Sequence, residues 1–105
     1  MIKQRKLIID EIVRRIVAAV HPEKIILFGS SAREETDLNS DIDILVIKSC
    51  EKRRQIAGLI YQNFIGIGHA VDIVVATPED VKNYGSNPAF VLEPALREGI
   101  VLYAA

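Results

Sequence analysis

Two aspartates separated by one residue are the part of this sequence best suited to chemistry. Asp41 and Asp43 open an apolar run that ends at Ile47. Residues two apart in a β-strand project from the same face, roughly 6.6 Å apart along the backbone. Carboxylates placed in this way can lean together onto one or two hard cations, and oxygen ligands suit magnesium or manganese. The pair therefore predicts a divalent metal site.

A third acid, Asp72, interrupts another apolar run at residues 70–76. An unpaired charge is costly to bury, so an acid inside a strand needs a partner or a function. Each acid also has an ordinary explanation, Asp41 as a turn residue and Asp72 as a strand acid neutralised by a lysine or arginine. If the strands of Asp43 and Asp72 are neighbours, however, all three acids share one site. Separate structural roles for the individual acids would not explain why all three interrupt apolar runs.

A Gly-Ser pair, Gly29-Ser30, ends a short apolar run and is separated from Asp41 by ten residues. Glycine lets a phosphate approach the backbone closely, while the serine hydroxyl and nearby amides can donate hydrogen bonds to phosphate oxygens. The pair alone is a weak signal, because Gly85-Ser86 repeats it. Beside three acids it indicates metal-assisted chemistry on a nucleotide.

The elements that must position these residues are those of a small α/β protein. Helical spacing of apolar residues predicts an amphipathic helix over 3–20, with Arg5 among the polar residues between them. Strands are predicted at 24–28, 41–47, 70–76 and 100–103, and helices at 31–35, 53–64 and after Thr77-Pro78 and Asn87-Pro88. We expect residues 1–105 to form one domain, a mixed sheet of about four strands flanked by helices.

Composition narrows the class of protein further. The net charge of -1 lacks the basic excess that neutralising many phosphates requires, so nucleic acid is an unlikely direct substrate. A lone cysteine, Cys50, excludes an internal disulfide and fits a reducing compartment. The first residues carry charges throughout, so we expect neither a signal peptide nor a membrane span, and a cytoplasmic protein.

Further residues accompany these motifs, with Ala32-Arg33 inside the ten-residue gap and Ser40 directly before the first acid. The whole set resembles the minimal nucleotidyltransferases of the polymerase-beta-like superfamily, and the resemblance spans most of the chain. Small stand-alone proteins of this kind look like the antitoxins of toxin-antitoxin pairs whose partner is a HEPN-domain ribonuclease. The resemblance implies a single nucleotidyltransferase domain that transfers AMP from ATP to a tyrosine hydroxyl of the toxin.

The resemblance also assigns roles to individual residues. Four of them would bind the triphosphate of ATP: Gly29, Ser30, Arg33 and Ser40. Three acids would be both the catalytic residues and the magnesium ligands, with two ions expected and manganese possible: Asp41, Asp43 and Asp72. Asp72 would also help to deprotonate the incoming hydroxyl. No motif fixes the base, so ATP as the substrate rests on the resemblance alone.

Two other functions stay open from the sequence. One is a non-catalytic antitoxin that blocks its toxin by contact. The other is a small-molecule nucleotidyltransferase of the antibiotic-modifying kind, although 105 residues leave little room for a pocket around a large acceptor. The basic cluster Lys52-Arg53-Arg54 is typical of a solvated helix start, and it could also contact an acidic partner surface.

Overall fold

The computed structural model describes residues 3–32, 41–85 and 92–105. Its centre is a four-stranded sheet in the order β3-β2-β1-β4. The strands are β1 (Lys24–Phe28), β2 (Ile42–Ile47), β3 (Val71–Ala76) and β4 (Ile100–Ala104). β1 is antiparallel to both β2 and β4, whereas β2 and β3 are parallel. The predicted mixed sheet of about four strands is therefore confirmed.

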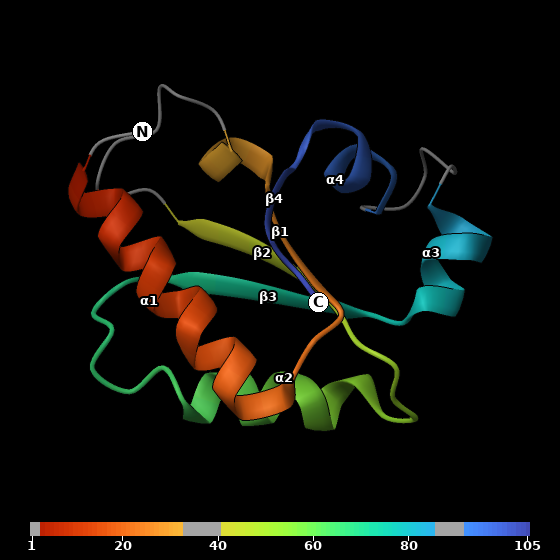
Figure 1. Cartoon of the computed structure of the whole chain (residues 1–105), viewed down its shortest axis with the longest axis horizontal. Helices are drawn as coiled ribbons and strands as arrows, with labels where there is room; N and C mark the ends of the chain where they lie inside the picture. The colour runs from red at the N-terminus through yellow and green to blue at the C-terminus, as the bar shows by residue number, and fades with distance from the viewer. Residues whose placement is uncertain (1–2, 33–40, 86–91) are drawn as a thin grey trace.

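Helices cover both faces of this sheet. They are α1 (Lys3–Val20), α2 (Arg53–Gln62), α3 (Pro78–Tyr84) and α4 (Leu92–Glu98), and a single 3-10 turn, η1 (Gly29–Ala32), follows β1. Figure 1 shows α1 and α2 grouped at one side of the sheet and α3 and α4 at another. None of the helices in the described ranges is both long and apolar enough to span a membrane.

The larger core lies between the sheet and the helices α1 and α2. It takes alternate residues of β1, β2 and β3, including Ile42, Ile44 and Val46 of β2, together with one apolar face of α1. The smaller core lies on the opposite face, where Leu45 and Ile47 of β2 pack with α4. Because side chains alternate along a strand, Asp43 belongs to the face of the smaller core. The candidate acids therefore lie on the side of the sheet away from α1 and α2.

One prediction about α1 is wrong. The sequence places Arg5 among the polar residues between the apolar positions, but its exposed fraction is only 1%. Arg5 precedes the buried residues Ile9, Ile12 and Ile16 by four, seven and eleven positions. That spacing puts it on the apolar stripe of the helix, a signal already present in the sequence.

Element boundaries differ slightly from those predicted. β2 begins at Ile42, so Asp41 lies just before the strand, and α2 ends two residues before Phe64. The turn after β1 is 3-10 and starts at Gly29. The predicted helix start at Asn87-Pro88 lies outside the described residues.

The predicted start of α3 at Thr77 is confirmed, and its contacts form a capping box. The Thr77 hydroxyl accepts a hydrogen bond from the Asp80 backbone amide at 3.0 Å, and the Asp80 carboxylate accepts one from the Thr77 amide at 3.0 Å. Arg53 donates to the same carboxylate at 2.6 Å. The backbone hydrogen bond from Thr77 is the main cause of a lowered pKa of Asp80, opposed by partial burial and assisted by Arg53.

Replacing Thr77 by alanine should lower the free energy of unfolding by about 1 kcal/mol, because an orphan amide loses its acceptor. For a domain of this size the melting temperature should fall by roughly 4 to 8 °C in a thermal melt followed by circular dichroism. Both proteins should lose stability on acidification, since the depressed pKa of Asp80 gives stability above the ordinary value of 3.8 that is lost as pH falls through the lowered pKa, and alanine keeps the Thr77 backbone amide that is its main cause. Thr77→Ser keeps the hydroxyl, and an equal loss for serine would contradict the capping role.

Candidate active site

Register brings two of the three candidate acids together. In the parallel pair of β2 and β3, Asp43 lies opposite Asp72, and in the antiparallel pair of β1 and β2 it lies opposite Phe28. Adjacent strands are about 4.8 Å apart, so the two acids are neighbours on one face of the sheet. The condition set by the sequence, that the strands of Asp43 and Asp72 pair directly, is met.

Gly29 lies so close to the carboxylate of Asp43 that no larger residue fits. Its φ is 65°, in the left-handed region that favours glycine, and a Cβ built on it would lie 2.7 Å from Asp43 Oδ2. Two independent reasons, backbone conformation and lack of space, therefore require glycine here. The Gly-Ser turn and the Asp-x-Asp pair, separated by ten residues in the sequence, meet at this contact.

The surroundings of Asp43 raise its pKa. Partial burial, then the negative charges of Asp72 and Asp41, raise the pKa of Asp43 above its ordinary value of 3.8. Asp41 is exposed, just outside the strand, and still acts on Asp43. Three acids thus gather enough negative charge to oppose ionisation of the central one, and a bound cation would offset that cost.

Arg5 is the residue at this end of the sheet that the sequence analysis missed. Its guanidinium Nη2 donates to the backbone carbonyl oxygen of Asp41 at 3.4 Å. This contact ties the first turns of α1 to the residue that precedes β2. A buried arginine thereby fixes the backbone from which the first acid projects, and adds a positive charge behind the acidic face.

The carboxylate oxygens of this site suit a metal ion that arrives bound to a nucleotide better than one that the protein holds by itself. Within residues 3–32, 41–85 and 92–105, no group of three His, Cys, Asp or Glu side chains is arranged to hold a metal alone. Magnesium commonly uses one or two carboxylates, completed by water and phosphate oxygens of the substrate. Asp43 and Asp72 are neighbours in register and Gly29 lies close to Asp43, so these residues supply that kind of half-site.

Only one of the remaining predicted phosphate-binding residues lies in the described part of the chain. Arg33 and Ser40 lie outside the described residues, so their assignment to the triphosphate stays a prediction. Ser30 follows Gly29 in the 3-10 turn, at the end of β1 nearest Asp43. Ser30 therefore lies near Asp43, and its contact with phosphate stays a prediction.

Comparison with known proteins places this arrangement in a class. The chain matches the family model described as "Polymerase beta, Nucleotidyltransferase" over residues 10–105. It therefore belongs to that nucleotidyltransferase family. None of the curated proteins matches it.

A solved structure from Sulfolobus solfataricus, provisionally described as a nucleotidyltransferase, has a similar fold. It superposes with a TM-score of 0.66 over 96% of this chain and 81% of that one, at 18% sequence identity. At this identity the likeness concerns the fold alone, a small α/β domain with a mixed four-stranded sheet.

Proposed function

We propose that this nucleotidyltransferase transfers AMP from ATP to a tyrosine hydroxyl of a HEPN-domain ribonuclease toxin, and so acts as its antitoxin in the cytoplasm. The observation that carries the transferase part is the position of Asp43, in contact with Gly29 and in register with Asp72. The protein substrate is inferred from the resemblance of the motifs to antitoxins of this type.

Each residue of the site would have its own role in the reaction. Gly29 and the backbone of Ser30 would receive the phosphates. Magnesium or manganese arriving with the nucleotide would be held by Asp43 and Asp72 together with phosphate oxygens, with Asp41, just before β2, as the third proposed ligand. The metal would supply neutralisation of the phosphate charge, including that of the departing pyrophosphate. Asp72 would accept the proton of the tyrosine hydroxyl, whose ordinary pKa is about 10. The phenolic oxygen then bonds to the α-phosphorus as the bond to pyrophosphate breaks.

Nucleotide binding should depend strongly on divalent cations. A triphosphate beside three carboxylates is repelled until a metal intervenes, so a non-hydrolysable ATP analogue should bind at least about tenfold more weakly in EDTA than in magnesium. Isothermal titration calorimetry measures both affinities, and calcium serves as a control for charge without catalysis. Equal affinity with and without a divalent ion would contradict the proposed site.

The test of the whole proposal separates a catalyst from a contact inhibitor. One catalytic molecule can silence many toxin molecules, so a sub-stoichiometric amount with ATP and magnesium should abolish the ribonuclease activity. The toxin should gain the mass of AMP and stay inactive after this protein is removed. A contact inhibitor requires about one molecule per toxin, needs no ATP and releases active toxin on dissociation.

The variant Asp72→Asn gives the matched control for this experiment. Loss of the proposed base should slow transfer by about 100-fold or more and leave the docking surface almost unchanged. Equal protection by Asp72→Asn and by the unaltered protein at a sub-stoichiometric dose would exclude the transferase and favour contact inhibition. The toxin for this experiment would be a HEPN-domain protein encoded beside this gene.

A further inference from the structure

A pocket of about 380 Å³ lies at the β3 edge of the sheet and is not used by the proposed nucleotide site. Residues 74–76 of β3 form one wall, and the others come from Arg53, Asp80, Tyr84 and Leu92. The floor is apolar. The rim is polar, because Arg53 and Asp80 form an ion pair at 2.6 Å and Tyr84 is 44% exposed.

The pocket shares a sheet face with the acids. Asp72, Val74 and Ala76 alternate along β3 and therefore project from the same side. Val74 and Ala76 lie about 6.6 and 13 Å from Asp72 along the strand. A ligand over Asp72 can thus extend directly into the pocket.

Strand order decides which substrate this pocket serves. Gly29 follows β1 and Asp72 is in β3, so the two lie on opposite sides of Asp43 in β2. In phosphoryl transfer the attacking and leaving oxygens are roughly in line. If pyrophosphate leaves on the Gly29 side, the attacking hydroxyl approaches over Asp72, from the β3 edge. The pocket is therefore on the acceptor side of the site.

The spacing of residues along β3 and the side chains that line the pocket indicate which peptide segment would fit. In an extended segment, the side chains two and four residues from the acceptor tyrosine project from its own face at about 6.6 and 13 Å. These are the distances from Asp72 to the pocket wall. An apolar floor suits an aliphatic or aromatic side chain, and Tyr84 and Arg53 are of the types enriched where proteins anchor partners.

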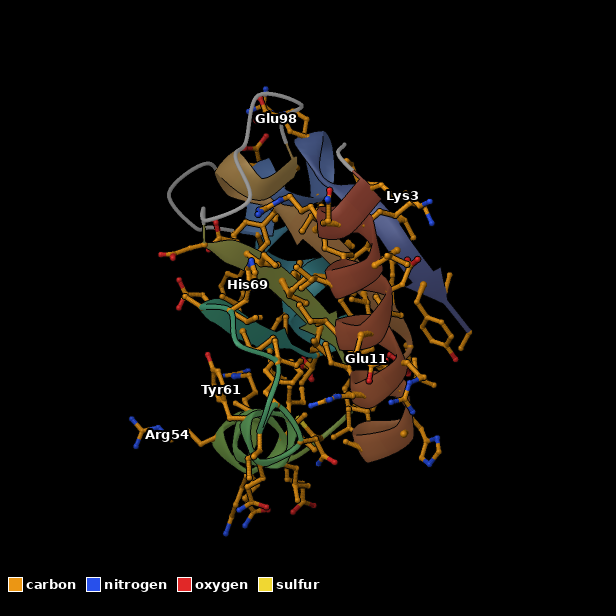
Figure 2. The ribbon with its side chains drawn as sticks, turned by 90° about the vertical axis from the view of Figure 1, so that its left-hand side faces the viewer. Lys3, Glu11, Arg54, Tyr61, His69 and Glu98 are labelled. Carbon is orange, nitrogen blue, oxygen red and sulfur yellow. The ribbon has the colours of Figure 1, made fainter. Side chains whose placement is uncertain are left out.

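The charges around the pocket give no preference for an acidic segment. Arg53 is already paired with Asp80, and the face that a bound segment must cross carries Asp43 and Asp72. Lys52 and Arg54 are exposed at the start of α2, and Figure 2 shows Arg54 pointing away from the body of the molecule. At the β3 edge, the Ile73 amide donates a hydrogen bond to the Tyr61 hydroxyl at 2.9 Å, so this donor is already used. That favours a segment that lies across the face over one that adds a strand.

We propose that this pocket docks an apolar side chain two or four residues from the acceptor tyrosine, in an extended segment of a partner protein. The inference rests on the proposed transfer to a protein hydroxyl. It adds a specificity site, formed by Tyr84, Arg53 and the β3 wall, to the three acids.

The probe is an oriented library of nine-residue peptides with a fixed central tyrosine and random residues elsewhere. The peptides that bind the full chain without ATP are sequenced, and binding of a selected peptide is then measured. We expect Leu, Ile, Met or Phe to be enriched two or four positions from the tyrosine. Tyr84→Ala and Arg53→Ala should each lower the affinity for the selected peptide by about tenfold, the equivalent of 1.4 kcal/mol.

The control is Leu59→Ala, because Leu59 is 45% exposed, close to the value for Tyr84, and does not line the pocket. It should leave peptide binding unchanged. Amide spectra of the ¹⁵N-labelled variants verify the fold, and Arg53→Ala carries the test if Tyr84→Ala is unfolded. No positional enrichment, or an equal loss with Leu59→Ala, overturns the proposal.

Two further outcomes separate this inference from the proposed function. If the library shows the expected enrichment but ATP and magnesium add no AMP to bound peptides or toxin, the docking site stands and the transferase reading fails. If AMP is transferred to the toxin but Tyr84→Ala leaves KM unchanged, the transferase stands and the docking site fails. An ATP analogue that alone shifts the amide signals of Tyr84 and Leu92 would assign the pocket to the base and overturn the proposal.

Discussion

Replacing Asp43 by asparagine is expected to slow AMP transfer by about 100-fold or more and to leave the protein as stable as before, or more stable. Asparagine has the size of aspartate but neither the charge that would bind a metal nor the charge that Asp41 and Asp72 repel. Intact mass measurement of the toxin gives the transfer rate, and thermal melting in EDTA gives the stability. We expect the melting temperature at neutral pH to stay the same or to rise.

The pH dependence of this stability follows from the raised pKa of Asp43. A folded pKa above the ordinary 3.8 means that the folded protein holds this proton more tightly than the unfolded chain does. The stability of the unaltered protein therefore falls as pH rises through the raised pKa, and the advantage of asparagine is complete above it. It should shrink on acidification.

An exposed aspartate provides the control for Asp43→Asn. Asp10 pairs with Lys6 on the surface of α1, and such pairs contribute little, so Asp10→Asn should change neither rate nor stability measurably. A clear drop in melting temperature for Asp43→Asn in EDTA would point to a structural role for this carboxylate.

The second large effect is expected from Gly29→Ala. The added Cβ would lie 2.7 Å from Asp43 Oδ2 and would force alanine into the left-handed region, at φ 65°. Left-handed backbone alone costs about 1 to 2 kcal/mol for a residue with a Cβ. Relief of the clash must move the carboxylate, and small displacements of reacting groups cost about 100-fold in rate. We expect both a lower melting temperature and the loss of transfer.

Two other glycines separate backbone strain from the clash. Gly66 also has a positive φ, 87°, but its Cβ would meet nothing within 4 Å, so Gly66→Ala should lose stability and keep transfer. Gly58 lies within α2 with open space around it, and Gly58→Ala should gain about 0.5 to 1 kcal/mol. Full transfer activity in Gly29→Ala would show that close contact between this turn and Asp43 is not required.

Local sequence determined much of this protein. The periodicity of apolar residues defines α1 and the four strands, because helical and extended backbones repeat at 3.6 and 2 residues whatever surrounds them. The cap at Thr77-Pro78 likewise depends on a few adjacent residues. The motif from Gly29 to Asp72 predicted a nucleotidyltransferase, and the chain belongs to such a family.

Tertiary structure decided how these parts meet. The parallel pairing of β2 with β3, the contact of Gly29 with Asp43 and the pocket beside Val74 all join segments distant in sequence. No local rule sets the strand order β3-β2-β1-β4, because pairing depends on how the whole apolar surface is buried. Arg5 illustrates the same division. Its spacing already placed it on the buried stripe of α1, but only the fold brought the backbone carbonyl of Asp41 within hydrogen-bond distance of its guanidinium.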